Sequence, residues 1–132
     1  MKTLTVISLL TLIALTTACG YSSKPAAPAP GSMPAIAQLN PDNATAGGAA
    51  FTLTVTGTNF GSKAVVNWNG VPQTSTAFVS GSELTVAVPA TAIMSATTVQ
   101  ITVTNPGTAG TGMYGSGGIA PATSTPMAFT IN

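Results

Sequence analysis

Charge is what this chain has least of. Only 4% of its 132 residues are charged, whereas roughly a quarter of the residues in an average soluble domain are. There is no histidine and no arginine, and the charged side chains are Lys2, Lys24, Lys63, Asp42 and Glu83. Such a chain cannot form the basic surface that a phosphate backbone requires, so we exclude nucleic acid as a partner.

The same absences remove the usual means of catalysis and metal binding. A single cysteine allows neither an internal disulfide nor a cysteine-based metal cage. A serine or threonine nucleophile needs a nearby base, and Asp42 and Glu83 fall in separate predicted turns without a basic partner. Asp42 followed by Asn43 is a weak calcium signal, and a turn-capping role suits it better. We therefore predict no catalytic residues, no metal, no cofactor and no enzymatic activity.

The first 18 residues have the order of a secretory signal peptide. One lysine is followed by an apolar stretch from Leu4 to Leu15 and then by small residues up to Ala18. The stretch is shorter than the roughly 20 residues of a transmembrane helix. We expect residues 1–18 to direct export, with cleavage after Ala18.

The only cysteine, Cys19, stands directly after this segment. The junction resembles the lipobox of bacterial lipoproteins, in which the cysteine receives palmitate-type acyl chains and becomes the mature N-terminus. Two or more acyl chains hold a protein stably on a membrane. The alternative is an ordinary signal peptide that leaves a free thiol at Cys19. By the same resemblance, Gly20 after the cysteine suggests the outer membrane if the host is Gram-negative.

Residues 19–33 form a predicted tether. The stretch is rich in proline, alanine and serine and has no apolar periodicity. Alternating Ala-Pro favours polyproline II, which spans about 3.1 Å per residue. The tether would therefore hold a domain away from the bilayer, although a leader segment with no spacing role is the alternative.

From Pro34 onward the pattern changes to short runs in which apolar and polar residues alternate. Such runs, separated by turn residues, are typical of an all-β sandwich whose two sheets bury one face each. We predict a single antiparallel β-sandwich of about seven strands over residues 34–132. Its predicted core includes one or two residues from each main run: Phe51, Val55, Trp68, Val86, Ile101 and Phe129.

Several short motifs add a family resemblance. The strand FTLTVTG is followed by the turn Thr58-Asn59-Phe60-Gly61, then by VVNWNG, ELTVAVP and VQITVTNPG. Together these segments resemble an IPT/TIG domain, which implies an immunoglobulin-like fold. In the turn, Gly57 and Gly61 are expected to permit positive φ angles, Asn59 to bond its own backbone, and Phe60 to plug the end of the core. The segment from Asn105 to Pro126 is longer than the short glycine-rich hairpin that family members usually have. The sequence therefore does not predict whether this last hairpin forms.

Two aromatic residues are candidates for ligand contact. Trp68 could be a sugar platform, but its place on an alternating strand favours the core. Tyr114, with Met113, lies in a glycine-rich insertion with no evident core to join. Tyr114 and Met113 are therefore the predicted contact residues, with a mobile loop as the alternative.

Two classes of function remain. The resemblance implies a non-catalytic module at the cell envelope that binds protein or glycan, anchored to the membrane through Cys19. The alternative is a structural spacer or a self-associating surface subunit, because threonine-rich strands with few lysines leave sheet edges unguarded.

Overall fold

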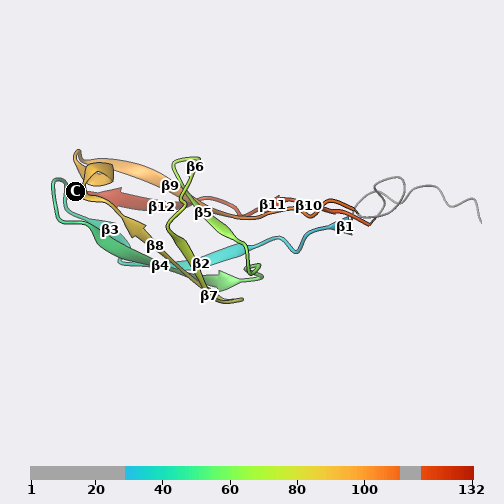
Figure 1. Ribbon diagram of the computed structural model, residues 1–132. Coiled ribbons are helices and arrows are strands. Elements are labelled where there is room, and N and C mark those ends of the chain that lie inside the picture. Colours follow the sequence, from blue (N-terminus) through green and yellow to red (C-terminus); the bar gives the residue numbers. More distant parts are fainter. Residues whose placement is uncertain (1–28, 111–116) are drawn as a thin grey trace, which may run out of the picture.

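The computed structural model describes residues 29–110 and 117–132, and its regular structure is almost entirely β. Two sheets lie face to face (Figure 1). The four-stranded sheet contains, in spatial order, β2 (Ala35–Asn40), β4 (Phe51–Thr58), β8 (Glu83–Val88) and β7 (Thr76–Ser80), all antiparallel. The six-stranded sheet contains β3 (Asn43–Ala44), β12 (Met127–Ile131), β9 (Thr97–Asn105), β5 (Val65–Trp68) and β6 (Val71–Pro72), with β11 (Ala122–Thr123) also paired to β9.

Seven of these strands have four or more residues. A 3₁₀ turn, η1 (Ala90–Ile93), connects β8 to β9, and no α-helix occurs in the described ranges. None of the described helical structure has the length and hydropathy needed to cross a bilayer. The predicted all-β, immunoglobulin-like antiparallel sandwich is confirmed.

The core lies between the sheets and follows the alternation of the sequence. On β4, β8, β9 and β12 every second side chain turns inward and is removed from water, and Val66 of β5 joins them. The buried apolar side chains from these runs are Leu53, Val55, Val66, Leu84, Val86, Val88, Val99, Ile101, Val103, Phe129 and Ile131. Each fully buried Val, Leu, Ile or Phe stabilises the fold by roughly 1.5–3 kcal/mol relative to an exposed one.

Four of the six predicted core residues are buried: Val55, Val86, Ile101 and Phe129. Phe51 and Trp68 were predicted to be buried, but both are only half-buried and pack against the buried core residues. The reason is their position, since Phe51 is the first residue of β4 and Trp68 is the last residue of β5. A side chain at a strand end lacks neighbours on one side.

The chain changes sheets after β2. Strand β2 pairs with β4 in the four-stranded sheet, and β3 then pairs parallel to β12 in the other sheet. The peptide bond between Asn40 and Pro41, which lies between these strands, is cis. The short β3 follows this peptide bond and carries the chain into the six-stranded sheet.

The turn after β4 is the most specific motif of the sequence. Phe60 is buried at the end of the core, as predicted. The positive φ, however, belongs to Asn59 (60°) and not to Gly57 or Gly61, and Asn59 donates from Nδ2 to the Met33 carbonyl (3.2 Å) rather than to its own backbone. Gly57 is required for space: a Cβ there would collide with the Ala35 carbonyl oxygen and lie 2.6 Å from the Phe60 ring.

Beyond β9 the chain forms an arm that extends away from the sandwich (Figure 1). We define the arm as residues 105–110 and 117–123. In it, Thr108 bridges Ile119, β11 pairs with the end of β9, and β10 (Ile119–Ala120) pairs parallel with β1 (Ala29–Pro30). The two described sides of the segment from Asn105 to Pro126 are thus paired antiparallel, as in a hairpin. Strand β1 falls within the stretch predicted to be the tether.

A single side chain ties the base of the arm to two other segments. Asn105 Oδ1 accepts from the Gly61 N–H (2.8 Å), and its Nδ2 donates to the carbonyls of Ser32 and Asn59 (both 2.8 Å). The segment that enters the domain, the turn after β4 and the arm are therefore joined at one end of the sandwich.

Candidate functional site

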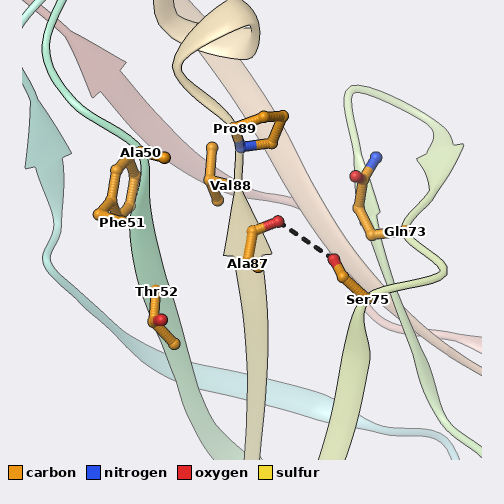
Figure 2. A pocket seen from close by; sticks show the side chains of 8 residues that line it. All are labelled: Ala50, Phe51, Thr52, Gln73, Ser75, Ala87, Val88 and Pro89. Atoms are coloured by element: carbon orange, nitrogen blue, oxygen red, sulfur yellow. Dashed lines mark hydrogen bonds between the residues drawn. The ribbon is translucent and has the colours of Figure 1, made fainter.

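A groove of about 590 Å³ opens at the end of the four-stranded sheet where β4 begins and β8 ends (Figure 2). Its volume falls within the roughly 300–1,000 Å³ that is usual for ligand sites. The lining residues come from these two strand ends and from the connection between β6 and β7: Ala50, Phe51, Thr52, Gln73, Ser75, Ala87, Val88 and Pro89.

Local sequence explains the shape of the groove. Thr52 and Ala87 are directly opposite each other in the β4–β8 ladder, and Phe51 is opposite Val88. Pro89 follows β8, and because proline has no N–H to continue the ladder, the strand stops there. Ser75 closes the third side, since its Oγ donates to the Ala87 carbonyl at 3.1 Å (Figure 2).

The half-buried ring of Phe51 anchors the apolar part of this site. It stacks on the fully buried ring of Phe129, with centroids 5.9 Å apart and an interplanar angle of 16°. Aromatic pairs in this geometry add about 0.5–1.5 kcal/mol beyond the area that they bury. Phe51 is thus supported by the core, and the exposed Pro89 adds apolar surface to the site, whereas Val88 is buried.

The polar part of the site is neutral. Gln73 Nε2 donates to the Val71 carbonyl (3.0 Å), which fixes the amide, and Figure 2 shows the amide oxygen on the side of the groove. Thr52 and Ser75 add hydroxyl groups, which both donate and accept. The groove therefore offers hydrogen bonds and an apolar surface but no charge, which suits an uncharged ligand.

The groove lies at one end of the sandwich, and the chain enters the sandwich at the opposite end, where β2 begins. Ala35, the first residue of β2, pairs with Thr58 at the last position of β4, whereas the groove surrounds the first positions of β4. Seven residue steps of about 3.4 Å separate Phe51 from Thr58, or roughly 24 Å. A chain held from its N-terminal side would present the groove at the far end.

The residues singled out from the sequence do not meet at this groove. Ala18, Cys19, Met113 and Tyr114 lie outside the described residues. Trp68 packs on Phe129, with centroids 5.3 Å apart and a tilt of 54°. This contact supports a core role for Trp68 over a free sugar platform.

Asp42 is exposed and accepts from Asn43 Nδ2 at 2.7 Å. No group of three potential metal ligands occurs in residues 29–110 and 117–132. This bond joins two neighbouring side chains, and the turn-capping role of Asp42 stays a prediction.

The groove itself was not anticipated. Gln73 and Ser75 are neutral residues outside the motifs of the sequence, and Thr52 lies far from both of them along the chain. Only the pairing of β4, β8 and β7 brings them together. The one available signal was Phe51 at the very start of an alternating run, where an aromatic side chain is half-covered.

Comparison with protein-family models matches residues 34–118 to the IPT/TIG domain. The match covers more than half of the chain. The chain belongs to the IPT/TIG domain family. IPT/TIG domains are immunoglobulin-like modules that are typically non-catalytic, often involved in binding or used as spacers. No curated protein and no solved structure matches the chain.

Proposed function

We propose that this chain is an exported, lipid-anchored and non-catalytic protein of the cell envelope that displays one IPT/TIG module for binding a protein or a glycan. The observation that carries the proposal is the placement of the groove at the end of the sandwich opposite the entry of the chain. An anchor at Cys19, followed by residues 20–28, would leave that end accessible to partners.

The chemistry of the groove supports an uncharged ligand. From residue 29 onward the chain has only three charged side chains, Asp42, Lys63 and Glu83, and none of them lines the groove. The half-buried Phe51 ring, together with the hydroxyl and amide groups of the lining, suits an uncharged ligand such as a glycan or a neutral segment of a protein. Affinity for such ligands should respond little to salt, because salt screens charges.

A photo-reactive amino acid placed at Ser75 tests the proposal on intact cells. The matched control places the same group at Thr130, an exposed position on the six-stranded sheet. Irradiation should give a discrete adduct from position 75 and none from position 130, and mass spectrometry of the adduct distinguishes protein from glycan. Equal adducts from both positions, or none from either, would contradict a dedicated binding groove.

The alternative, a spacer or self-associating subunit, is favoured by one separate observation, the exposed edge of the four-stranded sheet. The two surfaces adjoin each other, because Ser75, which lines the groove, directly precedes Thr76 at the start of β7.

A further inference from the structure

The outer edge of β7 is an unpaired strand edge with an apolar surface. Strand β7 is the last strand of the four-stranded sheet, and no strand in the described ranges pairs with its outer side. The Thr76 N–H donates to the Gln73 carbonyl (3.2 Å), and the remaining backbone N–H and C=O groups on that side are free to pair with another extended strand. The edge extends from Thr76 to Ser80.

Two consecutive large apolar residues are exposed on this strand. Phe78 is 42% exposed and Val79 is 54% exposed. The other exposed large apolar side chains of the described residues, Met33, Val71, Met94 and Ile119, lie singly on different segments. Exposed apolar residues that cluster on a strand edge mark a site for association.

The remaining edges of the sandwich are better protected. Strands β3 and β6 have two residues each, and β6 includes Pro72, which has no N–H to donate. Strand β2 is longer, but its exposed side chains are small or polar: Ala35, Ala37, Gln38 and Asn40. The register of β7 against β8 is irregular between Phe78 and Ser80. Thr76, Ala77 and Phe78 pair with β8 without interruption, so this part of the edge is regular.

We infer that β7 pairs antiparallel with β7 of a second copy of this chain, to form a dimer with one continuous eight-stranded sheet. An antiparallel pair of identical strands is self-complementary about a two-fold axis, which is the symmetry of most homodimers. The new contact covers Phe78 and Val79 of both copies and uses the free backbone groups of each edge.

The low charge of the chain does not oppose a second copy at this edge. The charged residue next to β7 is Glu83, which lies on β8 and pairs with Ser80. Both β7 strands would stand between the two Glu83 side chains, so the direction of pairing follows from the two-fold symmetry and not from charge. With only Asp42, Lys63 and Glu83 charged from residue 29 onward, two copies approach with little repulsion.

Two valines of similar exposure provide the test. Val79 lies on β7, and Val71, which is 60% exposed, lies on the short β6. The full chain is produced with Cys19→Ala, which removes lipid attachment and any disulfide between copies. Val79→Lys and Val71→Lys are then compared with this parent by sedimentation velocity at low and high salt, with circular dichroism to show that each variant is folded.

The parent and Val71→Lys should form dimers. Val79→Lys should raise the dimer dissociation constant at least about tenfold, because a lysine on the edge must be buried or displaced when the strands pair. Salt should change the dissociation constant of the parent by less than about twofold. A monomeric parent at high concentration, equal effects of the two lysines, or a dimer that tolerates Val79→Lys would each overturn the inference.

Discussion

The indole of Trp68 packs against the ring of Phe129, with centroids 5.3 Å apart and a tilt of 54°. Phe129 is fully buried and also stacks on Phe51, so one ring at the centre of the sandwich supports an aromatic side chain from each sheet. The core therefore supports, through Phe129, the Phe51 ring that lines the groove.

This arrangement predicts graded losses of stability. Phe129→Ala should lower the free energy of unfolding by about 3 to 5 kcal/mol, the usual cost of truncating a buried aromatic residue. Trp68→Ala should cost less, about 2 to 3 kcal/mol, because part of the indole remains in water in the native state. Urea unfolding measures both, with Thr130→Ala as the exposed control. A loss under about 1 kcal/mol for Trp68→Ala would identify it as a surface residue.

Gly57 tests the packing of the turn after β4. A Cβ at this position would meet the Ala35 carbonyl oxygen and the Phe60 ring, whereas the nearest atom to a Cβ at Gly81 is 3.7 Å away. Gly57→Ala should therefore destabilise the domain by about 2 kcal/mol or more, which is the scale of overpacking. Gly81→Ala should change stability by less than about 0.5 kcal/mol. Equal melting temperatures for the two variants would show that the turn relaxes without cost.

Much of this fold could be predicted because alternation reports directly on which face of a strand is buried. The inward residues of β4, β8, β9 and β12 follow from period two alone. The turn at Asn69 and Gly70 follows from residue type as well, since both adopt positive φ angles (48° and 82°). Residue type was therefore sufficient to predict a feature wherever that feature depends on neighbours in the sequence.

The remaining features depend on contacts between distant segments. The space restriction at Gly57 comes from Ala35 and Phe60, and the groove comes from the ends of three strands. The sequence alone could not show that Phe51 and Trp68 lie at strand ends, where burial is incomplete. It also could not show which of the threonine-rich strands would be the exposed edge.

We predict that the Asn105 side chain holds the segments around it in place. Its side chain makes three hydrogen bonds, each with a net contribution of about 0.5–1.5 kcal/mol. Asn105→Ala should therefore lower stability by about 2 to 4 kcal/mol. It should also speed hydrogen exchange at the Gly61 amide, which loses its acceptor.

Asn43→Ala is the matched control for Asn105→Ala, because the Asn43 side chain bonds only the exposed Asp42 side chain among the described residues. It should leave the Gly61 amide and the overall stability nearly unchanged. Unaltered Gly61 exchange in Asn105→Ala would show that the three segments are held together by other contacts.

We expect the IPT/TIG module to be held at a membrane through Cys19. The direct measurement is the intact mass of the wild-type protein extracted from membranes, together with the distribution of Cys19→Ala between membrane and soluble fractions. The mature chain should begin at Cys19 and bear acyl chains, and the Cys19→Ala variant should be released from the membrane. A free thiol at Cys19, or a mature N-terminus at another residue, would contradict it.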